Sequence, residues 1–395
     1  MTNSLEIYET LLNLPNLKVS EVFIFPRELH IHCKIINKSS QKCPSCTTSV
    51  VSRKVKYSRE IRDLDSSGRK VILHLLVHQY TCVCGRSFSE TFDFVDANKS
   101  YTKRQAKYIF EMSAQQSHCQ VGALTDTCSK TVERMCYNYQ SVDAIDWSRI
   151  KRIGIDEFAF KKGHKDFIVL LIDLDTHEII DILEKRDKEF LRAYFEEIGK
   201  EFCSQIKDFC SDMWGPFQDL AKEIFPNASI HVDRFHWTIH LNKVIDSARK
   251  SLRKTNLDEE AYKGLKWKLI KRPTNLNEEE QEALKKAFFL NPQLEKLYQM
   301  RNHFQAIFDA TYSYDFAEKQ IDNWLEEADQ LQNKYLTKFI QLFNRHRKNI
   351  LNYFKNRISS GAVEGTNNLL RTVKRITFNM TNFVNFKYRV LAYKN

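Results

Sequence analysis

The sequence predicts a multidomain α/β protein whose central part is a mixed five-stranded sheet with helices. Three strand-like segments follow one another in residues 152–183, and one of them is the near-continuous apolar run FIVLLIDL. Two further strand-like segments each follow a helix-like segment, at residues 206–213 and 227–236. A long, charged, helix-patterned stretch then separates these strands from a last helix. Alternation of strand and helix patterns of this kind is typical of a sheet covered by helices.

The composition favours a polyanionic partner. The 395 residues include 61 Lys and Arg against 50 Asp and Glu, which gives a formal charge of +11. This balance favours nucleic acid, although ribosome or membrane-surface binding would give the same number. The first ten residues contain no apolar signal region, and the longest apolar runs have about six residues, too few to cross a bilayer. We therefore expect a cytoplasmic protein whose ten cysteines are reduced, some of them as metal ligands.

Residues 1–98 have the pattern of a β-rich, zinc-binding unit. Two close cysteine pairs, one with CxxC and one with CxC spacing, flank strand-like sequence and can offer four thiolates to one tetrahedral Zn²⁺. The expected ligands are Cys43, Cys46, Cys82 and Cys84. The CxC pair is one residue shorter than usual, so His30, His32 or Cys33 could replace a missing ligand. The alternative is that these cysteines are buried free thiols.

Residues 99–148 are patterned as short helices. Helical spacing of apolar residues predicts helices at 103–117, 120–124 and 130–139. Ser129 is placed to cap the third helix. The arrangement resembles a DNA-binding helix-turn-helix, in which the residues facing the groove would be Lys130, Thr131 and Arg134. An ordinary three-helix bundle is the alternative.

Residues 149–238 carry two or three carboxylates at strand ends. Asp156 lies inside the first strand among apolar residues, where a charge is costly unless a partner such as a metal ion offsets it. The fourth strand ends at Asp212 and the fifth at Asp233. Strand-strand-strand-helix-strand-helix-strand is the order of a ribonuclease-H-like sheet. In that sheet the first and fourth strands are neighbours, which would bring Asp156 and Asp212 together, although Asp233 could take the place of Asp212.

Residues 239–350 and 351–395 are predicted to be helical. The first range has helical apolar spacing and reads as an all-α insertion, with a basic cluster RKSLRK that could hold DNA or a partner subunit. The cluster contains Arg249, Lys250, Arg253 and Lys254. The second range predicts a helix that begins near residue 360. One stripe of that helix, suited to a metal site beside phosphates, contains Glu364, Asn368, Arg371 and Arg375.

Three carboxylates of one site would suit phosphodiester chemistry. Two Mg²⁺ ions about 4 Å apart can activate the attacking oxygen and stabilise the leaving oxygen, and carboxylates offset the charge of such ions. Asp156, Asp212 and Glu364 are the candidates for this role.

The sequence resembles the DDE transposases of bacterial insertion sequences, of the ISL-three group, over nearly its whole length. Three segments carry the resemblance. The first-Asp strand of that family is similar to GIDEFAFKKGH, and its second-Asp block is similar to SDMWGPF followed by FPNASIHVDRFH. Its final-Glu block is similar to SSGAVEGTNNLLRTVKR. The cysteine unit and the helix-turn-helix match its front end. Two departures are the CxC pair and the segment FNMTNF after Arg375.

The resemblance implies a function and its parts. Asp156, Asp212 and Glu364 would be the catalytic triad with two Mg²⁺ or Mn²⁺ ions, and Asp233 and His236 would support the site. Double-stranded DNA, both terminal repeats and target, would be the partner, with a homodimer on DNA and association with the bacterial nucleoid. The alternatives are a transposase-derived regulator that binds without cutting, and a ribonuclease-H-type nuclease.

Overall fold

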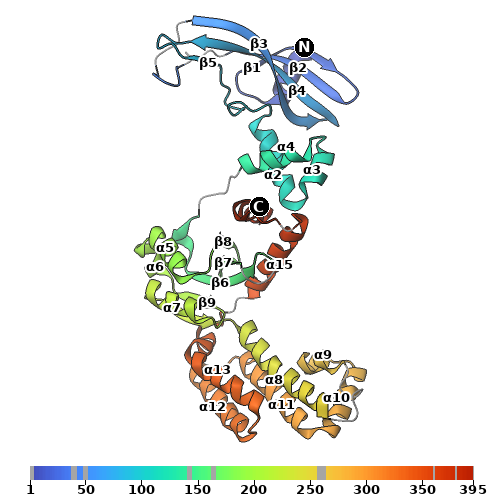
Figure 1. Ribbon diagram of the computed structural model, residues 1–395, viewed down its shortest axis with the longest axis vertical. Coiled ribbons are helices and arrows are strands. Elements are labelled where there is room, and N and C mark those ends of the chain that lie inside the picture. Colours follow the sequence, from blue (N-terminus) through green and yellow to red (C-terminus); the bar gives the residue numbers. More distant parts are fainter. Residues whose placement is uncertain are drawn as a thin grey trace. The chain divides into compact units, whose positions relative to one another are not determined.

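The computed structural model describes residues 4–36, 42–47, 52–139, 145–161, 166–255, 264–358, 361–378 and 380–394 (Figure 1). The chain divides into two compact units, which we describe separately. Unit 1 contains Met1–Asp143 and Thr372–Asn395, and unit 2 contains Ala144–Arg371. No helix in the described ranges is both long enough and apolar enough to cross a membrane.

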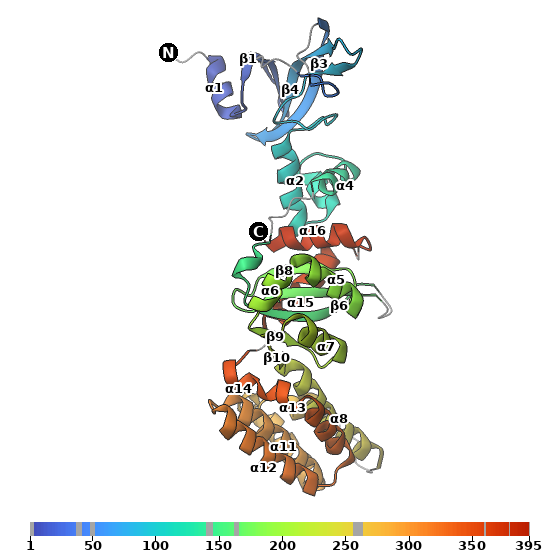
Figure 2. The same cartoon turned by 90° about the vertical axis from the view of Figure 1, so that its left-hand side faces the viewer.

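Unit 1 begins with a sheet in the order β1-β2-β4-β3, with β5 paired to β4. Its elements are α1 (Ser4–Leu12), β1 (Leu17–Ile24), β2 (Glu28–Ile35), β3 (Ser52–Ser66), β4 (Arg69–Thr81) and β5 (Ser87–Ser89). Along β4, Val71, Leu73, Leu75 and Val77 alternate with less buried residues, so one face of the sheet is a core. Figure 2 shows α1 beside β1, where Leu12 joins this core.

Three short helices follow the sheet, α2 (Lys103–Gln115), α3 (His118–Leu124) and α4 (Ser129–Asn138). Ser117 and Gln120 form a capping box at the start of α3. The prediction that Ser129 caps the next helix was wrong, because the amides of Thr131 and Val132 bond to the carbonyl of Cys128 and α4 therefore begins at Ser129. Gly122 lies within α3, and a Cβ there would lie 2.6 Å from the backbone oxygen of Thr127 in the following turn, so this close approach requires glycine.

Unit 2 contains the predicted five-stranded sheet, in the order β10-β9-β6-β7-β8. The strands are β6 (Arg152–Ala159), β7 (Phe167–Asp173), β8 (Ile179–Leu183), β9 (Asp208–Ser211) and β10 (Ser229–Val232). β6, β7 and β8 are antiparallel, whereas β9 pairs parallel with both β6 and β10. The apolar run of β7 is buried along nearly its whole length, as the sequence predicts for a central strand.

Helices complete unit 2. Those interleaved with the strands are α5 (Lys188–Ile198), α6 (Lys200–Gln205) and α7 (Gly215–Ile224). A second group is α8 (Arg234–Thr255), α9 (Leu265–Ile270), α10 (Glu278–Leu290), α11 (Pro292–Asp309), α12 (Tyr314–Gln330) and α13 (Lys334–Leu351). This group has its own aromatic core, in which Trp237, Phe304 and Trp324 are almost completely buried. The chain then passes through α14 (Tyr353–Asn356) to α15 (Gly361–Ile376), whose residues from Thr372 onward group with unit 1, as does α16 (Phe383–Lys394).

The basic cluster RKSLRK on α8 is not one exposed surface. The side chain of Arg249 is only 9% exposed, and its Nη2 atom lies 2.7 Å from Oδ1 of Asp246. Lys250 is 64% exposed and pairs with the same carboxylate at 2.9 Å. The side chains of Arg253 and Lys254 lie outside what the structure describes. Arg249 is therefore buried against a carboxylate of its own helix, and the role of the cluster in holding DNA or a partner subunit stays a prediction.

Charge reversal should affect the free energy of unfolding differently at Arg249 and at Lys250. Arg249→Glu is expected to lower the free energy of unfolding by about 3–5 kcal/mol, because it breaks a buried ion pair and leaves Asp246 beside a like charge. Lys250→Glu should cost about 1 kcal/mol or less, because that pair is exposed. Urea unfolding of both variants measures the difference, and equal stability would contradict a structural role for Arg249.

Candidate functional site

Three carboxylates lie at corresponding positions on adjacent strands of the unit 2 sheet. Along the parallel pair of β6 and β9, Arg152 lies opposite Asp208 and Gly154 opposite Cys210. Asp212 directly follows β9, and continuing that register by two residues places it beside Asp156 of β6. Val232 lies opposite Ser211, so the same continuation places Asp233 on the other side of Asp212. The predicted pairing of the first and fourth strands is confirmed, and it brings the first two carboxylates to one edge of the sheet.

Both oxygens of the Asp156 carboxylate are hydrogen-bonded. Nδ2 of Asn367 donates to Oδ2 at 2.7 Å, and the amide of Glu157 donates to Oδ1 at 2.8 Å. Burial raises the pKa of Asp156, and the nearby Asp212 adds to the shift, whereas His236 and the bond from Asn367 oppose it. The carboxylate is thus held in place in a setting where its negative charge is unfavourable without a nearby cation.

His236 lies between two of the carboxylates. Its Nε2 atom is 3.9 Å from Oδ1 of Asp156 and 3.8 Å from Oδ2 of Asp233. Asp233 directly follows β10 and its side chain is 7% exposed, while His236 is in the first turn of α8. The histidine therefore bridges the end of β10 to Asp156.

Asp212 is fixed by the turn that follows β9, and the arginine nearest to this turn bonds to Glu157. Oδ1 of Asp212 accepts a hydrogen bond from the amide of Trp214 at 2.9 Å. The Arg186 guanidinium lies 5.0 Å from the ring centre of Trp214 and 4.2 Å from that of Phe167, and it bonds to Glu157 at 2.6 Å. Burial raises the pKa of Glu157, and Arg186 opposes this shift. Glu157 is thus engaged by an arginine.

The helix α15 brings Asn367 to this site and carries Glu364 one turn earlier. Glu364, Asn368, Arg371 and Arg375 are all exposed, and Nη1 of Arg371 donates to Oδ1 of Asn368 at 2.7 Å. The predicted stripe exists, but Asn367 rather than Asn368 contacts Asp156. Among described residues, Asp156, Asp212 and Glu364 do not gather their oxygens within 4.8 Å of one another.

Sequence reasoning missed Asn367. The predicted stripe follows Glu364 in steps of four and seven residues, and these steps select Asn368. A step of three residues also stays on one helix face and would have selected Asn367. The paired asparagines of GTNNLL were the available signal.

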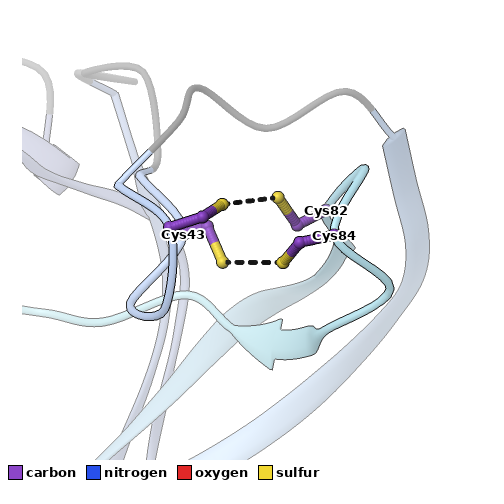
Figure 3. Close-up of side chains that lie close together, drawn as sticks. Cys43, Cys82 and Cys84 are labelled. Carbon is purple, nitrogen blue, oxygen red and sulfur yellow. Dashed lines mark hydrogen bonds between the residues drawn. The ribbon is translucent and has the colours of Figure 1, made fainter.

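The four predicted cysteine ligands lie together in unit 1 (Figure 3). The Sγ atoms of Cys43 and Cys84 are 3.7 Å apart, those of Cys46 and Cys82 are 3.4 Å apart, and all four lie within 4.8 Å. A tetrahedral ZnS₄ centre with Zn–S bonds of about 2.3 Å has S–S edges of about 3.8 Å, so the set fits Zn²⁺. Gly85, with φ of +86°, closes the tight turn that lets a CxC pair contribute both thiolates.

The substitutes considered for a missing zinc ligand are placed elsewhere. Cys33 is buried in the sheet core. His30 and His32 instead stack on His74, with ring centres 5.1 and 4.4 Å apart. None of the three belongs to the ligand group found in the described ranges.

The predicted DNA-reading residues lie on α4. Lys130 and Arg134 are exposed and Thr131 is half-buried, whereas Val132 and Met135 are buried against α2 and α3. The exposed face of α4 is therefore basic and polar.

Comparison with known proteins finds transposases. A family model described as a transposase matches residues 153–390, more than half of the chain. A second, described as the zinc-finger of transposase IS204/IS1001/IS1096/IS1165, matches residues 39–84. The transposase for insertion sequence element IS1001 of Bordetella parapertussis is 26% identical over 329 residues, which cover 80% of each chain.

More distant similarities extend the comparison. The transposase for insertion sequence element IS1557 of Mycobacterium tuberculosis is 23% identical over 298 residues, covering 65% of this chain and 66% of that protein. Among solved structures, the Drosophila P element transposase strand transfer complex matches with a TM-score of 0.41 and 12% identity, over 75% of this chain and 92% of that one. The predicted family is confirmed by the model that spans most of unit 2, and the chain belongs to the ISL3 family of DDE transposases, enzymes that cleave DNA and transfer its strands.

Proposed function

We propose that this transposase binds the terminal inverted repeats of an insertion sequence and uses Asp156, Asp212 and Glu364 as its catalytic carboxylates. The observation that carries the proposal is the register of β6 and β9, whose continuation beyond Gly154 and Cys210 supports a position of Asp156 beside Asp212. Asn367, one helical turn after Glu364, bonds to Asp156 and so supports placing the final carboxylate at the same edge. The sheet order supports a ribonuclease-H-like core.

The residues at this edge suit two Mg²⁺ or Mn²⁺ ions. Carboxylate oxygens are the ligands that these ions prefer, and the raised pKa of Asp156 marks a charge that a cation would stabilise. When bound, a pair of such ions activates the attacking oxygen and stabilises the leaving oxygen. The chain itself orients Asp156 through Asn367 and supports Asp233 and Asp156 through His236. Asn368, Arg371 and Arg375 would face the phosphates.

The proposed division of the chain follows these roles. Residues 1–98 form the zinc-binding domain, 99–148 the helix-turn-helix, 149–238 and 351–395 the two parts of the core, and 239–350 an all-α insertion. The helices α8 to α13 and their separate aromatic core support the insertion. The compact units differ from this division at the end of the chain, because residues from Thr372 onward group with unit 1.

DNA recognition is assigned to Lys130, Thr131 and Arg134 on the exposed face of α4. Since two element ends must be joined, we propose that the enzyme acts as a homodimer on DNA at the nucleoid.

One assay separates this function from its alternatives. Labelled terminal-repeat DNA is incubated with the full chain and Mg²⁺, and both cleaved and joined products are measured. A transposase yields both, specifically with terminal repeats. Binding without cleavage would indicate a regulator, and cleavage of any duplex without joining would indicate a general nuclease.

Asn367 provides a test of the site that does not remove a carboxylate. Asn367→Ala is expected to lower the cleavage rate by about 10–100-fold, because groups that orient a metal ligand contribute on this scale. Asn275→Ala, at an exposed position of the insertion, should leave the rate unchanged. The rate on pre-bound DNA checks both variants, and an unchanged rate for Asn367→Ala would show that the contact with Asp156 is unimportant.

A further inference from the structure

The last helix of the chain is part of the helix-turn-helix unit. In α16, Phe386 and Val390 are fully buried, and Tyr388 packs against the core shared by α2, α3 and α4. Arg389 is 6% exposed and donates to the carbonyl of Gln116 and to Nε2 of His118, the latter at 3.0 Å. These contacts join segments about 270 residues apart in the sequence. Among the described residues, α16 is therefore a fourth helix, from the C-terminus, that packs with α2, α3 and α4.

The turn before α16 forms one wall of a groove whose other wall is the predicted recognition helix. The groove has a volume of about 400 Å³. Ser129, Lys130 and Glu133 line it from α4, while Phe378, Thr381 and Asn382 line it from the turn. Phe378 is 81% exposed and Thr381 is exposed, so this wall is open to a partner.

The lining of the groove matches the chemistry of a DNA backbone. Hydroxyl, amide and ammonium groups are the common donors to phosphate oxygens, and such contacts set the position of a protein on the duplex. Lys130 and Ser129 offer these donors from α4, and Thr381 and Asn382 offer them from the turn. The one acidic residue on α4 here, Glu133, is engaged by the hydroxyl of Tyr137 at 2.7 Å.

We propose that this groove holds the sugar–phosphate backbone of the terminal-repeat duplex beside α4, so that residues 377–378 and 380–382 form a second DNA-contacting segment. The proposal rests on the proposed function, because it takes α4 as the recognition helix. Lys130 would touch the backbone from one wall and Thr381 from the other. It follows that a fragment ending at residue 148 lacks both this wall and the helix that packs on α2, so residues 1–148 alone should bind terminal repeats poorly.

The test uses the full chain and matched surface variants. Thr381→Glu introduces a negative charge into the groove, and Thr274→Glu introduces the same change in an exposed Thr-Asn pair of unit 2. Phe378→Ala and Phe289→Ala form a second matched pair, since Phe289 is 89% exposed on α10. Dissociation constants for terminal-repeat and random duplexes are measured by fluorescence anisotropy without Mg²⁺, at two salt concentrations. Thermal unfolding checks that each variant is folded.

Thr381→Glu is expected to weaken binding to terminal repeats roughly 10-fold and to flatten the salt dependence, because the new carboxylate repels the phosphates and salt screens this repulsion. Thr274→Glu and Phe289→Ala should bind like the unchanged protein. Unchanged affinity of both Thr381→Glu and Phe378→Ala would overturn the groove assignment while leaving the proposed function intact. A change in sedimentation mass at unchanged affinity would also overturn it, in favour of a second copy of the chain. If the unchanged protein does not prefer terminal repeats, the proposed function itself fails.

Discussion

Asp156→Ala, Asp212→Ala and Glu364→Ala are each expected to fold and bind DNA normally but to cleave more slowly by several orders of magnitude. The physical reason is that each substitution removes an oxygen ligand from a site whose ions act as a unit. For the same reason the losses should not add when substitutions are combined. Single-turnover cleavage of labelled terminal-repeat DNA measures the effect, with affinity determined in parallel.

The matched comparison is Asp233→Ala. Asp233 lies on the other side of Asp212 in the sheet and contacts His236, so its loss should be milder if it only supports the site. If Asp212→Ala still cleaves DNA and Asp233→Ala does not, Asp233 is the catalytic carboxylate and Asp212 is the supporting residue.

Loss of zinc is the second large effect that we expect. The purified protein should contain about one zinc per chain, and the double substitution Cys82→Ser with Cys84→Ser should remove it. Structural Zn²⁺ contributes an apparent binding free energy of about 10–16 kcal/mol, so the turns at residues 42–47 and 82–89 should lose their fold. The sheet has an apolar core of its own and should persist. Elemental analysis and hydrogen exchange measure the two outcomes.

Two exposed cysteines outside the cluster provide the control. Cys119→Ser with Cys128→Ser changes the same number of thiols and should leave the zinc content unchanged. Zinc retained after loss of Cys82 and Cys84, or lost in the control, would show that the metal is held elsewhere.

The strands and their end carboxylates were predictable because their signals are local. β7 is an uninterrupted run of branched apolar residues, and Asp156 interrupts the apolar pattern of β6. The cysteine pairs are also local signals, and the distance between their sulfur atoms shows that CxC spacing completes the set.

Features that depend on distant packing were not predictable. The packing of α16 on α2 could not be predicted. Phe386 and Val390 indicate that α16 has a buried face, but its sequence does not indicate which distant segment covers that face. The interior position of Arg249 was missed because a basic cluster looks the same whether it faces solvent or an internal carboxylate. Asp246, three residues earlier, was the local clue.

The position of bound metal tests the central claim most directly. Crystals of the full chain with cleaved terminal-repeat DNA and Mn²⁺ would give anomalous scattering from each ion. We predict two ions, with oxygen atoms of Asp156 and Asp212 about 2.1 Å from metal and Glu364 completing the set. Ions bound by Asp233 instead of Asp212, or a site in which Glu364 stays far from both aspartates with DNA bound, would contradict the account.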